Sequence, residues 1–145
     1  MGMALRRVYR RIYKSYDERI ELWGNVIMTE KFRASEIELK KNIEILDGTF
    51  SRFGFEVMNV GIEYADMLGG KGIKFFCEIM SNECMPEDAI YHIKVNVYNN
   101  NGDLISMGSD MIDTNDFTGY DTLNVVVFHE SIHDEAAKAR IYLTK

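Results

Sequence analysis

One short stretch of the chain carries residues that could perform metal chemistry. His129, Glu130 and His133 stand in the order H-E-x-x-H within the segment VVVFHESIHDE. On an α-helix, positions four apart point the same way, so the two histidines could take adjacent corners of a tetrahedral zinc site. Glu130 would then polarise a metal-bound water as general base, which is the chemistry of a small zinc-dependent hydrolase.

Two observations oppose this zinc interpretation. A catalytic zinc needs a third protein ligand, yet few residues follow His133, and alanines stand where a longer form of the motif has Gly and His. The three valines at 125–127 favour a strand, in which residues four apart lie ~13 Å from each other. We therefore interpret the segment as a polar turn between the last two strands, with zinc on His129 and His133 as the alternative.

A second set of possible ligands is acidic. The residues are Asp110, Asp113, Asp116 and Asp121. Calcium prefers carboxylate oxygens, so a calcium-binding surface module is a further alternative. The preceding turn NNNGD does not match a calcium loop, because Val97 and Gly108 would occupy positions where an EF-hand has carboxylates. We predict no catalytic residue and no cofactor, with zinc or calcium kept as alternatives.

Composition limits the classes of partner. The chain has 145 residues, 46% of them hydrophobic, which suits one core rather than several. A net charge of -6 argues against nucleic acid, which needs a cationic surface. No apolar run reaches the length of about 20 residues that spans a bilayer. We expect a cytoplasmic protein as the sequence stands, or an exported one if a signal sequence precedes it.

An amphipathic α-helix is expected within residues 1–24. Apolar residues recur there at helical spacing, with basic residues on the other face. The apolar set is Leu5, Val8, Tyr9, Ile12, Tyr13, Tyr16, Ile20 and Trp23, and the basic set is Arg6, Arg7, Arg10, Arg11 and Lys14. Acidic residues dilute the charge of its second half, so we expect packing against protein, including self-association into a homodimer, rather than membrane binding.

The remaining residues, 35–145, alternate apolar and polar positions as half-buried strands do. The clearest apolar sets are Ile73, Phe75, Cys77 and Ile79; Tyr91, Ile93, Val95 and Val97; Leu123, Val125 and Val127; and Ala137, Ala139, Ile141 and Leu143. Residues 90–112 are expected to form a hairpin through NNNGD. The two cysteines, Cys77 and Cys84, do not make a disulfide framework, so free thiols are expected.

Residues 35–57 are harder to interpret. Ile37, Leu39, Ile43 and Ile45 alternate as in a strand, whereas Glu36 and Lys40 have helical spacing. We favour a strand over 35–46, because Asp47-Gly48 follows as a turn and a β-like run from Phe50 to Val57 comes next. Counting then gives about seven short strands, the pattern of an antiparallel sandwich.

The hairpin also resembles a known family. Val95-Asn96-Val97-Tyr98-Asn99, followed by Asn101-Gly102-Asp103, is similar to the strand and turn that name the FxLYD-type immunoglobulin-like modules. The segments FTGYDTLNVVVF and AKARIYL are similar to the closing strands of those modules. Over residues 55–145 the resemblance implies a β-sandwich that serves as a binding or spacer module without catalytic residues.

The sequence thus predicts a mainly β protein. Its expected parts are an amphipathic helix at 1–24 and an immunoglobulin-like antiparallel sandwich at 35–145. Its expected function is that of a non-enzymatic interaction or spacer module for an unknown protein partner.

Overall fold

Strands make up most of the part of the chain that the structure describes, which is residues 35–67 and 70–145 of a computed structural model. All of these residues belong to one unit, Ser35–Lys145. The predicted helix within residues 1–24, and the self-association predicted through it, lie outside the described residues.

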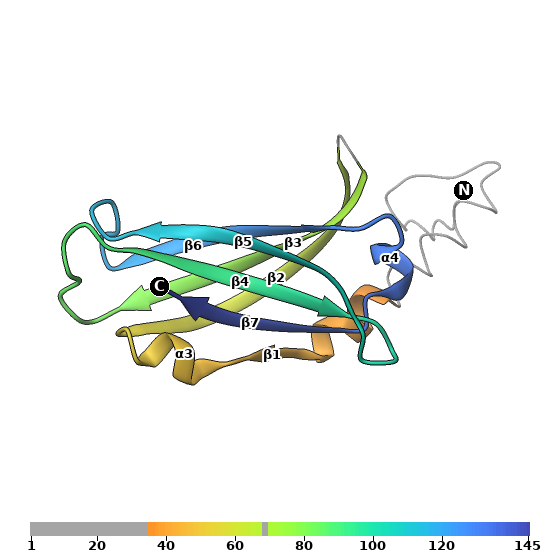
Figure 1. Cartoon of the computed structure of the whole chain (residues 1–145), viewed down its shortest axis with the longest axis horizontal. Coiled ribbons are helices and arrows are strands. Elements are labelled where there is room, and N and C mark those ends of the chain that lie inside the picture. Colours follow the sequence, from red (N-terminus) through yellow and green to blue (C-terminus); the bar gives the residue numbers. More distant parts are fainter. Residues whose placement is uncertain (1–34, 68–69) are drawn as a thin grey trace, which may run out of the picture. The chain divides into compact units, whose positions relative to one another are not determined.

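Seven strands and three short helices run through the described residues (Figure 1). The strands are β1 (Ile43–Ile45), β2 (Phe55–Met67), β3 (Gly70–Ser81), β4 (Ile90–Tyr98), β5 (Leu104–Asp113), β6 (Tyr120–Phe128) and β7 (Lys138–Thr144). The helices are residues 35–41, α3 (Asp47–Ser51) and α4 (Ile132–Glu135). The predicted mainly β fold is confirmed for this part of the chain.

The strands form two sheets. One has four strands in the order β1-β7-β4-β5, and the other has three in the order β2-β3-β6. Every hydrogen-bonded pair is antiparallel except β1 with β7, which is parallel. The predicted hairpin over 90–112 is the β4–β5 pair, and Asn99 closes its turn by accepting from the backbone N–H groups of Asn101 and Asp103 at 2.9 Å each.

The core lies between the two sheets and follows the predicted alternation. Inner side chains with 0% exposure include Ile73, Phe75, Cys77, Ile79, Ile93, Val95, Val97, Val125, Val127, Ala139 and Ile141. Because successive side chains of a strand point to opposite faces, these positions bury one face of each strand and leave the other to solvent. Burial of this apolar surface is the main stabilising contribution to the fold.

At one side of the sandwich β5 and β6, the edge strands of different sheets, lie against each other. Ser106 Oγ donates to the carbonyl of Phe128 at 2.6 Å, and the N–H of Asn124 donates to Asp110 Oδ2 at 3.3 Å. Between these bonds a Cβ on Gly108 would lie 2.3 Å from the carbonyl oxygen of Val126. Only glycine permits this close approach of two backbones.

The prediction of a strand over 35–46 is wrong for most of its length. Residues 35–41 are helical, and only Ile43–Ile45 join a sheet. The helix inserts Leu39 into the core at 0% exposure and leaves Ile37 56% exposed, so tertiary packing outweighs the alternation. The predicted turn at Asp47-Gly48 is also wrong, because these residues begin α3, which buries Phe50.

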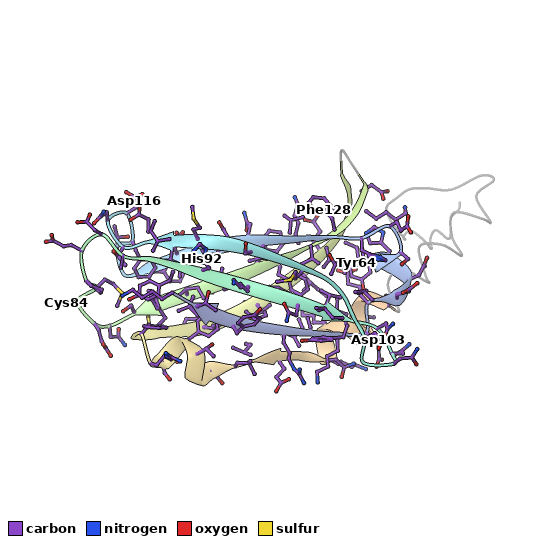
Figure 2. The ribbon with its side chains drawn as sticks, in the orientation of Figure 1. Tyr64, Cys84, His92, Asp103, Asp116 and Phe128 are labelled. Atoms are coloured by element: carbon purple, nitrogen blue, oxygen red, sulfur yellow. The ribbon has the colours of Figure 1, made fainter. Side chains whose placement is uncertain are left out.

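The two cysteines lie in different environments and are both free, as predicted. Cys77 is buried in β3, and this burial, with a smaller effect of Asp110, raises the pKa of its thiol to about 12. Cys84 is exposed in the loop between β3 and β4, at one end of the sandwich (Figure 2).

The approach of β5 to β6 makes a first prediction. Gly108→Ala should lower the free energy of unfolding by about 1–3 kcal/mol, because the added methyl group must push the two strands apart. Gly48→Ala is the matched control, since nothing lies within 4 Å of its Cβ position and alanine suits a helix better. Urea unfolding of both variants measures the difference. A Gly108→Ala protein as stable as the parent would contradict the close approach.

The thiols give a second prediction. A thiol reagent at pH 8 should label Cys84 rapidly and Cys77 only after unfolding, because the thiolate is the reactive form and the raised pKa of Cys77 keeps it protonated. Counting labelled thiols with and without denaturant measures this. Cys84→Ser should remove the labelling of the folded protein. Labelling that persists in this variant would show that Cys77 is accessible.

Candidate functional site

The residues of the H-E-x-x-H motif do not share one helix. His129 directly follows β6, Glu130 is exposed in the turn, and α4 begins only at Ile132. His129 donates its backbone N–H to Lys71 O at 3.2 Å, and its Nδ1 accepts from the N–H of Ser131 at 3.2 Å. The ring therefore organises the turn between β6 and α4.

His133 is buried and is held by contacts with β2 and β3. It is 3% exposed, and its Nε2 donates to the carbonyl of Gly72 in β3 at 2.9 Å. Its ring stacks on that of Tyr64 in β2, with centroids 5.1 Å apart and planes 17° from parallel. A ring nitrogen that donates to a carbonyl is not a zinc ligand in this arrangement, because a ligand needs its lone pair.

A chain of hydrogen bonds extends this contact to the helix at 35–41. Ser35 Oγ bonds to Tyr64 Oη at 2.9 Å and donates to the carbonyl of His133 at 3.0 Å. Burial is the main cause of the raised pKa of Tyr64, which the Ser35 bond partly offsets and Glu36 augments. Together these contacts fix α4 and the helix at 35–41 to the β2–β3 hairpin. The predicted polar turn thus contains a short helix that buries Ile132 and His133 and leaves Asp134 and Glu135 exposed.

The acidic residues predicted as calcium ligands lie on different elements. Asp110 and Asp113 belong to β5, Asp121 to β6, and only Asp116 lies in the loop between them. Three of these carboxylates accept local backbone N–H groups, from Met111, Asn115 and Thr122. Among the described residues, His, Cys, Asp and Glu nowhere gather in groups of three or more that could hold a metal ion.

The outer face of the four-stranded sheet offers a different kind of site. Its side chains form transverse rows because paired residues share a face. Two central rows contain Glu44, Arg140, Asn96 and Met107 in one and Tyr142, Lys94 and Ser109 in the other. A third row, on one side of these, contains Lys138, Tyr98 and Leu104. A fourth row, on the other side, contains Thr144, His92 and Met111. We name this surface the tyrosine face, after Tyr98 and Tyr142.

The polar groups of the tyrosine face hold one another in place. Arg140 Nε donates to Glu44 Oε1 at 2.8 Å, and its guanidinium lies 5.2 Å from the ring centroid of Tyr98. Asn96 Nδ2 donates to Tyr98 Oη at 3.3 Å, and Tyr142 Oη donates to Asn96 Oδ1 at 3.4 Å. These side chains from three strands therefore order one another through direct contacts.

Charge and apolar surface complete the tyrosine face. Lys94, Lys138 and Arg140 outnumber Glu44, and the hydrogen bond from Arg140 is the main cause of the lowered pKa of the Glu44 carboxyl. Met107 and Met111 remain 52% and 57% exposed beside these charges. Tyrosine, methionine and arginine are enriched where proteins bind each other. The tyrosine face therefore combines net positive charge with exposed apolar side chains.

The tyrosine face is visible in the sequence only as separate alternating segments. The outward alternation of His92, Lys94, Asn96 and Tyr98, and that of Lys138, Arg140 and Tyr142, are visible in the sequence. The pairing of β4 with β7 is not visible, because more than forty positions separate residues such as Asn96 and Tyr142. The signal that could have suggested it is a tyrosine on the same outward face as a lysine or arginine, which occurs in both 92–98 and 138–142.

Comparison with known proteins found no match. No family model, no curated protein and no solved structure matches the chain. Within residues 35–67 and 70–145, no helix is long and apolar enough to cross a membrane.

The two histidines give a third prediction. His133→Ala should lower the free energy of unfolding by about 2–4 kcal/mol, because it leaves a cavity beside Tyr64 and removes the bond to Gly72. His129→Ala should cost less than about 1 kcal/mol, since its ring bonds only to the neighbouring turn. Urea unfolding compares the free energies of unfolding of the two variants. Dialysis against zinc should leave the urea midpoint of each variant unchanged. A zinc-dependent stabilisation of the parent that both variants lose would instead support the zinc alternative.

Proposed function

We propose that this chain is a non-enzymatic protein-interaction module whose tyrosine face binds a partner protein. The observation that carries the proposal is the preordered set of Tyr98, Arg140 and Tyr142 beside exposed methionines. Residues of these types contribute most of the binding energy in measured interfaces, particularly when they need little ordering.

We propose further that the fold is an immunoglobulin-like sandwich of the FxLYD type. The similar segment, Val95 to Asn99, is the end of β4 and the start of the turn to β5, and two of its residues, Asn96 and Tyr98, belong to the tyrosine face. The two segments that are similar to the closing strands of these modules contain β6 and most of β7. These strands lie in different sheets, so the chain crosses from one layer of the sandwich to the other between them. This supports a module that presents a sheet surface rather than a catalytic cleft.

The charge of the tyrosine face defines the partner's chemistry. Lys94 makes no ion pair with the described residues, and Lys138 and Arg140 share the one carboxylate of Glu44. A partner that supplies carboxylates would pair with Lys94 and the exposed side of Arg140. Such pairs add orientation and speed of association more than affinity, which would come from the tyrosine and methionine side chains.

The fourth prediction tests this function. The double variant Arg140→Ala, Tyr142→Ala should lose captured partner proteins by about tenfold or more relative to the parent, because it removes two central contacts of the tyrosine face. Lys74→Ala, Tyr120→Ala is the matched control, since it removes one cation and one tyrosine from the other sheet. Affinity capture with quantitative mass spectrometry compares the three proteins, after circular dichroism confirms that each is folded.

Two results would contradict the proposal. Equal capture by the parent and by the Arg140→Ala, Tyr142→Ala variant would show that the tyrosine face does not bind the partners. Equal loss in both double variants would show that general surface charge, rather than this face, retains them.

A further inference from the structure

Among residues 35–67 and 70–145, strand β2 is a sheet edge. Within the described part of the chain it pairs with β3 alone and lies at the end of the three-stranded sheet. It is also the longest strand described, with 13 residues. An edge strand presents a row of backbone donors and acceptors, which another extended segment can continue.

The other sheet edges are closed or very short. β5 and β6 lie against each other through the bonds of Ser106 and Asp110. The edge of β7 is covered first by β1, which has only three residues, and then by α3, where Thr49 Oγ1 accepts from the N–H of Leu143 at 3.0 Å. Among the described strands, β2 therefore differs from the rest in both length and openness.

The core is incompletely covered along β2. Three inner residues of β3, which are Phe75, Cys77 and Ile79, have 0% exposure, whereas their partners in register on β2 are only half-buried. These half-buried partners are Val57, Val60 and Ile62. The difference arises because β3 has a neighbour on each side and β2 has one. An added strand would place its own inward side chains beside these three residues and remove them from water.

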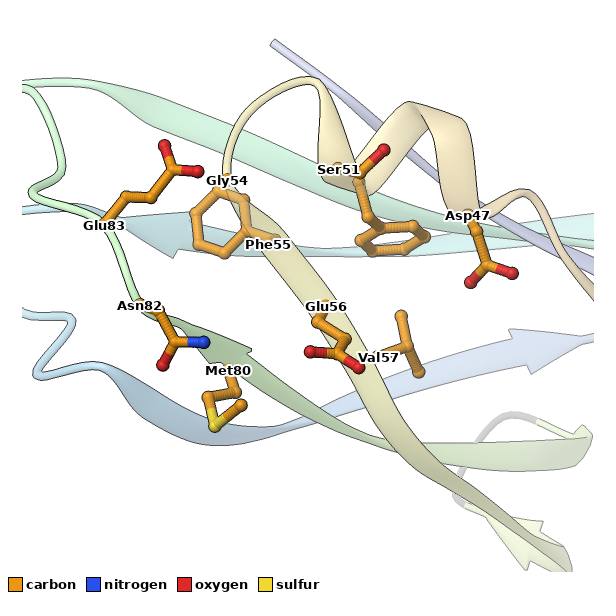
Figure 3. Close-up of a pocket in the computed structure, with 10 residues that line it drawn as sticks. Asp47, Ser51, Gly54, Phe55, Glu56, Val57, Met80, Asn82 and Glu83 are labelled. Carbon is orange, nitrogen blue, oxygen red and sulfur yellow. The ribbon is translucent and has the colours of Figure 1, made fainter.

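A groove of about 440 Å³ lies at the start of β2, between β2, α3 and the end of β3 (Figure 3). Its apolar part includes Phe55, Val57 and Met80. The groove is therefore continuous with the half-buried row, since both contain Val57.

The charged part of this groove is entirely acidic. Asp47 comes from α3, Glu56 from β2 and Glu83 from the loop after β3, as Figure 3 shows. No lysine or arginine lines the groove, and none of the three carboxylates forms an ion pair within the described residues. Further along β2 the carboxylates are matched, because Lys74 pairs with Glu63 and Lys71 with Asp66. The unmatched negative charge of this edge thus lies at the Phe55 end.

We propose that the β2 edge binds an extended segment of a partner protein in which apolar and basic residues alternate. The segment adds a strand beside β2, its apolar side chains cover Val57, Val60 and Ile62, and a lysine or arginine enters the acidic groove. The alternation follows from strand geometry, because the inward and outward faces of an added strand continue those of β2. This surface belongs to the other sheet and does not depend on the tyrosine face.

The β-bulge in β2 affects the pairing. The register with β3 shifts between Val57 and Asn59, which places Met58 outside the regular ladder and leaves it 49% exposed. Bulges interrupt edge pairing and make indiscriminate strand addition harder. A bound segment must therefore accommodate the bulge, which favours a partner selected by the groove over addition of any strand.

Peptides provide the direct test. A fluorescently labelled peptide in which valine and lysine alternate should bind the full chain in anisotropy titrations. A peptide in which valine and glutamate alternate should not bind. A peptide with the same valines and lysines in blocks should bind at least about tenfold more weakly, because it cannot present one face of each kind. Equal binding of the alternating and block peptides would overturn the proposal.

Substitutions in the protein locate the site. Glu56→Lys with Glu83→Lys should weaken binding of the alternating peptide by about tenfold or more. Asp103→Lys with Glu130→Lys is the control with the same change in net charge, at exposed positions in other turns. Equal weakening by both pairs would show attraction to net charge only and would overturn the proposed site.

Two N-methylated peptides test the pairing itself without altering the protein. In a strand, the N–H groups of alternate residues point to the same edge. Methylation of the valine amides and methylation of the lysine amides therefore block opposite edges. One methylated peptide should lose binding and the other should keep it. Equal affinities of the two, or a parent chain that dimerises through β2 and excludes the peptide, would overturn the proposal.

Discussion

The close contact between β5 and β6 constrains how the edges of the two sheets meet. Two edge strands normally leave rows of unpaired backbone groups, which can pair with another chain. Here the side chains of Ser106 and Asp110 replace a strand partner for Phe128 O and the N–H of Asn124. This substitution works only because Gly108, between them, has no side chain to hold the strands apart. A small residue and two short polar ones thus connect the edges of the two sheets, beside the apolar core that packs their inner faces.

The same contact determines what the outer face of β5 presents. Because Ser106, Gly108, Asp110 and the buried Ile112 lie on the inward face of β5, the alternate residues Met107 and Met111 point outward. They lie beside Asn96 and His92 of β4 and extend the tyrosine face to the edge of the sheet. The inward residues of β5 therefore make the contact between the sheets, and the outward residues of the same strand expose the methionines.

The sequence was informative wherever one face of a strand is buried and the other is not. The alternations in β3, β4, β6 and β7 predicted the core correctly, and the turn at Asn99 to Asp103 followed from its own residues. Prediction failed where long-range contacts decide the local structure. Leu39 makes residues 35–41 helical by entering a core built from distant strands, and Phe50 does the same for α3. The role of His133 depends on its hydrogen bond to Gly72, 61 positions away. The tyrosine face depends on the register of β4 with β7. Local periodicity in the sequence could predict neither of these long-range contacts.

The parallel pairing of β1 with β7 has a consequence for how the chain is made. β1 is the first strand in the described sequence and β7 is the last, yet β7 lies inside its sheet, between β1 and β4. On the ribosome the chain emerges from its N-terminus, so β1 must wait without its partner while the other strands are synthesised. Until residues 138–144 leave the exit tunnel, the edge of β4 that pairs with β7 has no neighbour. The buried apolar side chains of β7 are also missing from the inner face of the sheet. Between the synthesis of β4 and that of β7, the nascent domain therefore exposes an edge that favours aggregation, and this sheet is complete only once β7 is available.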